Sequence, residues 1–530
     1  MSDSTTASPA EAASLGSQAE KGMMSEKTTT QPEGVSQLRG LGAGELENRG
    51  PRWLQTVQHY SNLLDRKLHI ESRGIERVLP TERDENLNYL DMMFLWFSCS
   101  AVISTVATGI LAGPSWLGLS VTNGFLAVFF GTSLGAACAA FMGTFGPRLG
   151  LRQIILARFS FGWYGGKLVA LVNAITELGW CLVGVVIGGQ ILNYISGGSC
   201  PTVVGIIILS ILSFVIAGFG YNIVHFYERY AFIPGFIATI ILCAVASRHF
   251  DSGAPNVSHG ATFSGSFLTM ITICFGSASG FLPIASDYYI TYPATTPRWK
   301  TFSLTWVGIT VPMVFFQSVG LAIGGSLGST PEWMEVYTTK GYGALIGTAL
   351  KPVHGFGTFL MVVFFLGLVA NNIPNTYSAG LSIQALTTYF AIIPRLFWTL
   401  VAVLIYAICG IAGRAHLMTI ISNFLSVIGY WTSALFMIVL QEDLIFRRKT
   451  GYNVESYADK TKLPWGAAAV LSFLLGIVGA VLGMNQTWYV GVIARQIGQK
   501  GGELGVIMAF IFTGVSYAPL RWLERRYSGK

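Results

Sequence analysis

The feature that most constrains this chain is a succession of apolar runs of about 20 residues each. A run of that length crosses the hydrocarbon core of a bilayer as a helix, because lipid offers the backbone no water to bond with. The pattern predicts an all-α polytopic membrane protein with twelve transmembrane helices. The runs lie at residues 90–113, 117–144, 164–195, 201–220, 224–247, 266–290, 301–325, 355–388, 396–412, 417–440, 465–484 and 503–520.

The composition agrees with this class of fold. Only 11% of the 530 residues are charged, against about 25% in soluble domains. The net charge of +7 does not indicate nucleic-acid binding, because most Lys and Arg lie in short loops between the apolar runs. The seven Cys show neither CxxC nor zinc-ligand spacing, and six of them lie inside apolar runs, where small buried residues are expected.

The positions of Lys and Arg predict the orientation of the helices. With both termini in the cytosol, 17 of the Lys and Arg after the first run lie on the cytosolic side and six on the outer side. Short cytosolic loops carry such an excess of positive charge. The outer six are Arg248, Lys340, Lys351, Arg414, Arg495 and Lys500.

The remaining segments complete the predicted domain organisation. Residues 1–50 are rich in Ser, Thr, Ala, Gly and Glu, have no apolar core, and are expected to form a disordered cytosolic tail rather than a signal peptide. Residues 51–88 form a cytosolic segment with a short amphipathic helix. Residues 89–520 are expected to form the membrane domain of twelve helices, and residues 521–530 a cytosolic C-terminal tail.

The eighth run is apolar but carries Asn371, Asn372, Pro374 and Asn375 in its middle. Polar side chains are costly in hydrocarbon, and proline removes a backbone donor. Secondary transporters build substrate sites from broken, polar helices near the membrane midplane. We interpret this stretch as one wall of such a site. Hydrogen bonding of the amides between helices is the alternative.

Runs 1 and 6 are interrupted as well. Interruptions in these two positions predict a core of two five-helix repeats of opposite orientation, followed by two C-terminal helices. Run 3 is then the counterpart of run 8. The interrupting residues are Gly109, Gly113 and Pro114 near the outer end of run 1, and Gly276, Gly280 and Pro283 in run 6.

Runs 1 and 3 add three candidate site residues. Glu177 is ionisable and lies within a run, which makes it a functional candidate, with a hydrogen bond to another helix as the alternative. Trp180 lies three residues later on the same face and either packs between helices or offers a flat surface to an aromatic ligand. The hydroxyl of Ser104 either reaches a ligand or bonds its own helix.

Two more carboxylates lie near the cytosolic interface. Glu228, at the start of run 5, is either a proton-coupling or gating group or a partner of Arg229. Asp287, at the inner end of run 6, is either a gating residue or a helix cap.

The sequence lacks the motifs of nucleotide-driven or catalytic proteins. It contains no GxxxxGK[ST], no HExxH and no recognisable Ser-His-Asp arrangement. We therefore expect no enzyme, no cofactor and no bound metal, and transport driven by an ion gradient.

Eight stretches resemble fungal purine-cytosine permeases of the nucleobase:cation symporter family 1. The resemblance implies ten core helices plus two, with helices 1, 3, 6 and 8 around the substrate, and uptake of nucleobases with protons across the plasma membrane. The stretches are GLRQIILARFSFG (150–162), LGW (178–180), FGYNIVHFYERYAFIP (219–234), ASDYY (285–289), ANNIPNTYSAGLSIQAL (370–386), IPRLFWT (393–399), IGYW (428–431) and FRR (446–448).

The resemblance also implies residue roles. The position matching Trp180 stacks on the base, a hydroxyl matched by Ser104 lines the site, and the glutamate matching Glu228 serves transport. The positions that shape the site match Asn371, Asn372, Pro374 and Asn375.

Two positions depart from the family pattern. Relatives commonly carry Asn where this chain has Gly184, and Trp where it has Phe281. Gly184 removes an amide and is expected to open space, and a lost hydrogen-bonding partner shifts substrate preference strongly. Vitamin B6 or another small heterocycle is therefore the alternative substrate, because SDYYITYP (286–293) and NTYSAGLSIQ (375–384) also resemble yeast pyridoxine permeases.

The coupling ion is predicted to be the proton. In sodium-coupled bacterial relatives, hydroxyl residues just before the first amide of helix 8 help to hold the ion. This chain has Val369 and Ala370 there, whereas hard cations need oxygen ligands.

Overall fold

The computed structural model describes residues 76–85, 87–218, 232–251, 253, 255–387, 389–390, 393 and 395–530. These residues are helical, with short 3₁₀ segments and a single isolated β-bridge. The main helices are α5 (Leu90–Ser100), α6 (Ile103–Ile110), α7 (Val121–Gly143), α10 (Arg158–Ile195), α11 (Thr202–Gly218), α13 (Phe232–Ala246), α14 (Gly260–Ser279), α15 (Arg298–Ser326), α18 (His354–Gln384), α20 (Arg395–Gly413), α21 (Leu417–Gln441), α22 (Ala467–Gly483) and α23 (Gly505–Ser528). Shorter ones are α8 (Phe145–Leu149), α9 (Gln153–Leu156), α16 (Pro331–Lys340) and α17 (Tyr342–Ala349).

The described helices confirm an all-α protein of many apolar spans. Nine of them are long and apolar enough to cross a membrane, and α5 with α6 makes a tenth if the bent pair is one span. The helices α11 and α22 are apolar but shorter, at 17 residues each. Each of the twelve predicted runs overlaps one of these helices or the bent pair, but the count of twelve crossings stays a prediction.

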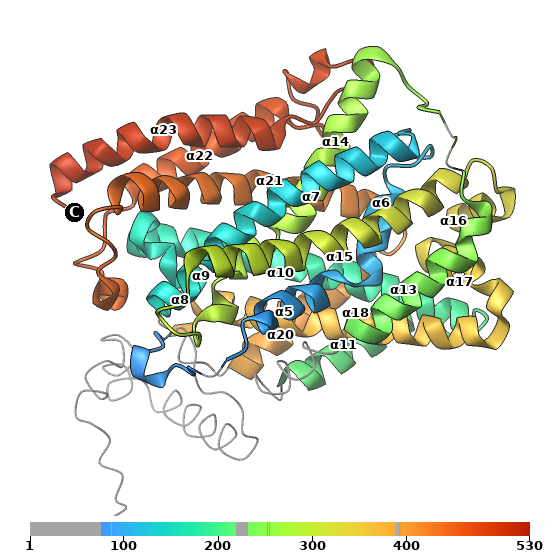
Figure 1. Cartoon of the computed structure of the whole chain (residues 1–530), viewed down its shortest axis with the longest axis horizontal. Helices are drawn as coiled ribbons and strands as arrows, with labels where there is room; N and C mark the ends of the chain where they lie inside the picture. The colour runs from blue at the N-terminus through green and yellow to red at the C-terminus, as the bar shows by residue number, and fades with distance from the viewer. Residues whose placement is uncertain are drawn as a thin grey trace, which may run out of the picture. The chain divides into compact units, whose positions relative to one another are not determined.

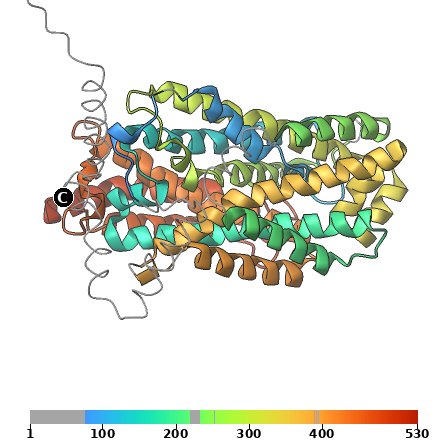
Figure 2. The same ribbon diagram turned by 90° about the horizontal axis from the view of Figure 1, so that it is seen from below.

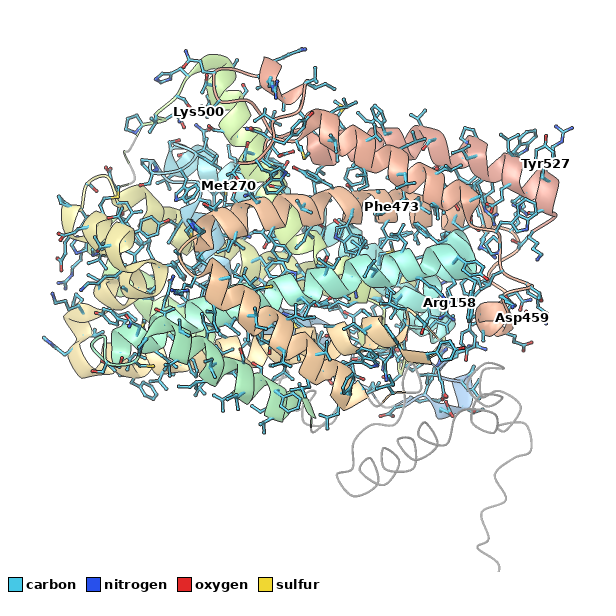
Figure 3. All side chains as sticks on the ribbon, turned by 180° about the vertical axis from the view of Figure 1, so that it is seen from behind. Arg158, Met270, Asp459, Phe473, Lys500 and Tyr527 are labelled. Atoms are coloured by element: carbon cyan, nitrogen blue, oxygen red, sulfur yellow. The ribbon has the colours of Figure 1, made fainter. Side chains whose placement is uncertain are left out.

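The long helices run side by side, with their ends gathered at two opposite ends of the bundle (Figures 1 and 2). The helices α16 and α17 lie at the end away from the C-terminus (Figure 1). We call that end the outer end and the opposite one the inner end, after the sides that the charge pattern assigns. Lys500 lies at the outer end, and Asp459 and Tyr527 lie at the inner end (Figure 3).

Glycines allow two pairs of helices to approach closely. A Cβ on Gly276 of α14 would lie 1.8 Å from the carbonyl oxygen of Leu425 in α21. A Cβ on Gly109 of α6 would lie 1.9 Å from the carbonyl oxygen of Gln317 in α15. Membrane helices pack through such small residues, because dispersion contacts rather than water exclusion hold them together. These contacts fix α6 and α14 on their neighbours.

The interruptions of spans 1 and 6 are present, but that of span 1 is not where the glycines predicted it. The α5–α6 pair bends by 60° at Ala101 and Val102, in the middle of the span. Gly109 lies inside α6, and Gly113 and Pro114 follow its end. In span 6, α14 ends at Ser279 and short 3₁₀ turns follow at Leu282–Ile284 and Asp287–Tyr289.

Span 8 differs from the expected broken helix. The helix α18 is continuous from His354 to Gln384 with Pro374 inside it. The hydroxyl of Thr376 donates a hydrogen bond of 2.6 Å to the carbonyl oxygen of Asn372. Side-chain hydroxyls of this kind re-satisfy backbone groups near a proline in a membrane helix.

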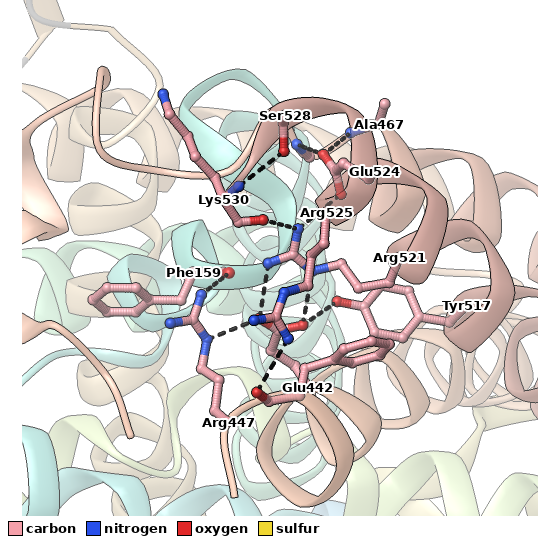
Figure 4. A network of polar contacts seen from close by, with 12 residues as sticks. Phe159, Glu442, Arg447, Ala467, Tyr517, Arg521, Glu524, Arg525, Ser528 and Lys530 are labelled. Carbon is pink, nitrogen blue, oxygen red and sulfur yellow. Dashed lines mark hydrogen bonds and ion pairs between the residues drawn. The ribbon is translucent and has the colours of Figure 1, made fainter. Parts of the chain in front are cut away.

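The C-terminal segment continues a helix beyond the boundary expected at residue 520. The helix α23 runs on to Ser528, and its Arg521 and Glu524 are buried. Arg521 bonds both Glu442, which begins a π-helical turn after α21, and Glu524 (Figure 4). The predicted tail 1–50 and the amphipathic helix of 51–88 fall on residues 1–75, outside the described residues.

Candidate functional site

A small pocket lies beside the break between α5 and α6. Its volume is about 20 Å³, roughly that of one water site. Spans 1, 3, 6, 7 and 8 all contribute to it. The lining residues are Cys99, Ser100, Val102, Ser104, Thr105, Thr108, Trp180, Ser277, Phe281, Met313, Asn371 and Asn375. None of them carries a charge, so the pocket is suited to a neutral ligand.

The break exposes backbone carbonyls that side chains satisfy. The amide of Asn371 donates a hydrogen bond of 2.9 Å to the carbonyl oxygen of Cys99. The hydroxyl of Thr105 donates one of 2.9 Å to the carbonyl oxygen of Ser100. Buried carbonyls without partners are costly in an apolar interior. These two side chains therefore stabilise the bend that forms one wall of the pocket.

The amides of α18 divide between the pocket and a helix interface. Asn371 and Asn375 are four residues apart and both line the pocket, as their helical spacing predicts. The side chain of Asn375 has no hydrogen-bonding partner among the described residues, so its amide offers the pocket both a donor and an acceptor. Asn372 and Pro374 are buried outside the lining, and the amide of Asn372 donates a hydrogen bond of 3.3 Å to the carbonyl oxygen of Cys181 in α10.

Gly184 does not open space as its small size suggested. A Cβ at this position would lie 2.3 Å from the Oδ1 atom of Asn372. The room left by the missing side chain is thus filled by Asn372 from the neighbouring helix. Gly184 lies in the α10–α18 interface and is absent from the pocket lining. It acts on the pocket only through the position of α18.

Two aromatic residues lie at the pocket. The Trp180 ring lies edge-on to Phe424, with the ring centroids 5.6 Å apart. Its Nε1 has no hydrogen-bonding partner among the described residues. The Phe281 ring lies in the interruption of span 6, between α14 and the turn at Leu282–Ile284, and packs on Trp96 of α5, with centroids 5.1 Å apart. The two rings supply apolar surface from α10 and span 6.

Glu177 lies one turn below Trp180, buried among helices. Only 1% of the residue is exposed, and both carboxylate oxygens are without hydrogen-bonding partners among the described residues. Asn173, a turn earlier, donates a hydrogen bond of 2.9 Å to Ser382 of α18. Glu177 is not part of the pocket lining. No hydrogen bond within the described residues therefore gives Glu177 a structural role between helices.

Asp287 lies at the inner end of the bundle. Its carboxylate accepts a hydrogen bond of 2.6 Å from the backbone N of Gln153, the first residue of α9, and lies 3.8 Å from a guanidinium nitrogen of Arg152. Arg152 in turn donates a hydrogen bond of 3.3 Å to the hydroxyl of Tyr377 in α18. The guanidinium of Arg395 lies 4.4 Å from the centre of the Tyr377 ring. Asp287 therefore bonds the start of α9 and belongs to a cluster that joins spans 6, 8 and 9.

The structure thus gathers Ser104, Trp180, Phe281, Asn371 and Asn375 around one pocket. Glu228 lies outside the described residues. Sequence reasoning missed Thr105, Thr108, Ser277 and Met313, which line the same pocket. The spacing of Ser104 and Thr108 by four residues was the available signal, because it places two hydroxyls on one helix face.

Comparisons with known proteins agree with these features. Residues 80–501 match the model of a family described as permeases for cytosine/purines, uracil, thiamine and allantoin. A vitamin B6 transporter of Saccharomyces cerevisiae is 33% identical over 92% of this chain and 94% of its own length. A purine-cytosine permease of Emericella nidulans is 35% identical over 88% of this chain and 91% of its own length.

The fold is also shared with solved transporters. A nucleobase-cation-symport-1 family transporter, in a closed conformation with bromovinylhydantoin bound, superposes with a TM-score of 0.64. The match covers 86% of this chain and 96% of the other at 13% identity. A sodium-coupled sialic acid symporter gives a TM-score of 0.57 at 10% identity, over 89% and 96% of the two chains.

Proposed function

Because the chain belongs to the family of permeases for cytosine/purines, uracil, thiamine and allantoin, we propose that it imports a purine base or cytosine together with protons. The chain is a multi-pass membrane transporter. We place it in the plasma membrane with both termini in the cytosol, as the excess of Lys and Arg in the predicted cytosolic loops favours.

The observation that carries the proposed substrate class is the chemistry of the pocket. Its lining holds amides, hydroxyls and aromatic rings and no charged side chain. An amide offers a donor and an acceptor side by side, which matches the edge of a nucleobase. In this proposal Trp180 stacks on the base, Asn375 reads its edge, and Ser104 and Phe281 complete the wall. Asn371 contributes by holding the break, and Gly184, Asn372 and Pro374 by setting the position of α18.

Vitamin B6 is the second candidate substrate. A transporter of vitamin B6 is 33% identical over most of both chains. The substitution of Gly184 and Phe281 for the residues common in purine-cytosine permeases favours it further. Pyridoxine is also a planar ring with polar substituents, so the same pocket chemistry applies.

The proposed coupling rests on buried carboxylates. Glu177 is an ionisable residue buried within a span, without hydrogen-bonding partners among the described residues, and ionisable residues in such places commonly belong to proton relays. Asp287 and Glu228 are the proposed gating or coupling partners at the inner side. Val369 and Ala370, in the place of hydroxyl residues, favour a proton over a sodium ion.

Uptake in a yeast strain without its own nucleobase transport tests the proposal. Labelled adenine, cytosine, hypoxanthine and pyridoxine are compared at two pH values, with and without an uncoupler. We expect uptake of at least one base that falls as external pH rises and collapses with the uncoupler. Uptake of none of the four refutes the substrate class, and uptake independent of both pH and uncoupler refutes proton coupling.

Matched variants then test the residues. Asn375→Ala should abolish uptake while the protein remains at the cell surface, and Gln499→Ala, an exposed amide of an outer loop, should transport normally. Glu177→Gln should bind substrate but lose the stimulation by acid pH. Normal transport by Asn375→Ala shows that the pocket is misassigned, and an unchanged pH profile of Glu177→Gln removes that residue from the coupling.

A further inference from the structure

A second, larger cavity lies at the outer end of the bundle. Its volume is about 460 Å³, within the range of 300–1,000 Å³ typical of small-molecule sites. It lies between the outer end of α10, the helices α16 and α17, and the loop between α20 and α21. The pocket beside the α5–α6 break has no room for a heterocycle in this conformation, whereas this outer cavity does.

Two positively charged side chains and one histidine line the outer cavity. Lys340, Arg414 and His416 line it, and its lining includes neither Asp nor Glu. Neither Lys340 nor Arg414 forms an ion pair with any residue in the described part of the chain. Arg414 donates one hydrogen bond to the carbonyl of Ile411. The cationic heads therefore remain available to a ligand.

Three helices begin at the outer cavity. Thr202, Tyr342 and Leu417 are the first residues of α11, α17 and α21, and all three line it. The N-terminus of a helix carries partial positive charge and backbone donors that favour an anion. The N-cap residues of α17 and α21, Gly341 and His416, form no side-chain capping hydrogen bond, and the side chain of Gln190 accepts one of 3.0 Å from the backbone N of Gly343 in the first turn of α17. The helix ends thus add to the field of Lys340 and Arg414.

Aromatic side chains give the outer cavity a flat wall. Trp116 and Tyr337 line it, and the indole nitrogen of Trp116 donates a hydrogen bond of 3.0 Å to the hydroxyl of Tyr337. This bond fixes the orientation of both rings. A bare inorganic anion would leave most of the 460 Å³ and these rings unused. A planar ring that carries a negative group fits the size, the rings and the charge together.

We propose that the outer cavity is a second binding site, for anionic planar heterocycles such as ring carboxylates. The neutral pocket at the α5–α6 break offers such a ligand no counter-charge, so the ligand binds at the outer end without being transported. A ligand bound there hinders movement of α16 and α17 and so inhibits uptake from outside. Binding is independent of the proposed transport function, and only the inhibition rests on it.

Calorimetric titration of the purified full chain with orotate, a uracil ring with one carboxylate, tests the binding. We expect Lys340→Ala/Arg414→Ala to weaken binding of orotate by about tenfold or more. The matched control is Arg248→Ala/Lys500→Ala, which removes two predicted outer cations that do not line the cavity, and it should bind as the unchanged chain does. Asn375→Ala should also bind orotate normally, because it changes the other pocket.

Ligand comparisons separate the charge from the ring. Uracil has the same ring without the carboxylate and should not displace orotate, and sulfate should compete only weakly. In cells, external orotate should inhibit uptake of a transported base without accumulating itself. Orotate affinity unchanged in the double variant, loss of binding in Asn375→Ala, or displacement by sulfate at equal concentration each overturns the proposal. If no base is taken up at all, the titrations still show whether the outer cavity binds orotate.

Discussion

The side-chain amide of Asn371 in α18 donates a hydrogen bond of 2.9 Å to the carbonyl oxygen of Cys99, at the end of α5. Span 8 thereby supports the break in span 1, although the two residues are 272 positions apart. The same amide lines the pocket, so one residue links the shape of the break to the site.

Replacement of Asn371 by Ala should destabilise the protein. It removes the donor to a buried carbonyl, and one such loss costs about 1–3 kcal/mol. We expect a lower melting temperature of the purified protein and reduced uptake. Thermal unfolding followed by size-exclusion chromatography measures the first effect. Equal melting temperatures of Asn371→Ala and the unchanged chain would falsify the structural part of this assignment.

Replacement of Gly184 by Asn, the residue common in purine-cytosine permeases, should not create a better site in this chain. The new side chain would collide with Asn372, and overpacking of a buried interface costs about 1–3 kcal/mol. We expect lower stability and uptake in Gly184→Asn, with partial recovery in Gly184→Asn/Asn372→Ala. Uptake assays and melting temperatures of the three proteins decide this. Full activity of the single variant contradicts the close fit of Gly184 to Asn372.

Replacement of Glu442 by Gln should loosen the C-terminal helix. The carboxylate is fully buried, receives hydrogen bonds from Arg447, Tyr517 and Arg521, and balances two guanidinium groups (Figure 4). Removal of one partner from a buried ion pair costs about 3–5 kcal/mol. We expect faster proteolysis of α23, and the exposed Glu455→Gln serves as control. Equal protease sensitivity of both variants argues against this role.

Replacement of Glu503 by Gln should change how stability depends on pH. Glu503 precedes α23 in an outer loop, and burial raises the pKa of its carboxyl although Asn485, Tyr430 and Gly505 donate hydrogen bonds to it. The pKa of this carboxyl is higher in the folded protein than in the unfolded chain, where it is about 4.3. As the pH rises above that value, the unfolded chain loses its proton more readily than the folded protein, so the free energy of unfolding falls. The unchanged chain should therefore lose more thermal stability between pH 4 and pH 7 than Glu503→Gln. Melting temperatures that change equally with pH in the two proteins contradict this prediction.

The sequence predicted the helices and the pocket face better than the details of packing. Apolar length alone located each run, and the polar stretch with Asn371 and Asn375 in run 8 indicated one wall of the pocket. The break at Ala101 and Val102 was not predictable, because neither residue is a helix breaker and the bend is stabilised from outside by α18. The fit of Gly184 to Asn372 depends on contacts between spans 3 and 8 that no local pattern encodes.

The outer cavity could not be predicted from the sequence for a related reason. Lys340 ends α16, whereas Arg414 and His416 belong to the distant loop between α20 and α21, and neither Lys340 nor Arg414 differs in the sequence from an ordinary surface cation. Only the three-dimensional fold, which places the junction of α16 and α17 and the start of α21 around one cavity, brings them together. The extension of α23 to Ser528 was missed because its charges suggested a solvated tail, whereas Arg521 and Glu524 are buried together.

Because the pocket has a volume of only about 20 Å³, the affinity of this transporter depends on the equilibrium between this narrow state and a wider one. A heterocycle binds only the fraction of molecules in which the pocket has widened, and the apparent dissociation constant exceeds the intrinsic one by the inverse of that fraction. Substitutions far from the pocket that populate the wider state would tighten binding without adding a single contact. Differences in affinity among relatives therefore need not originate in the residues that touch the substrate.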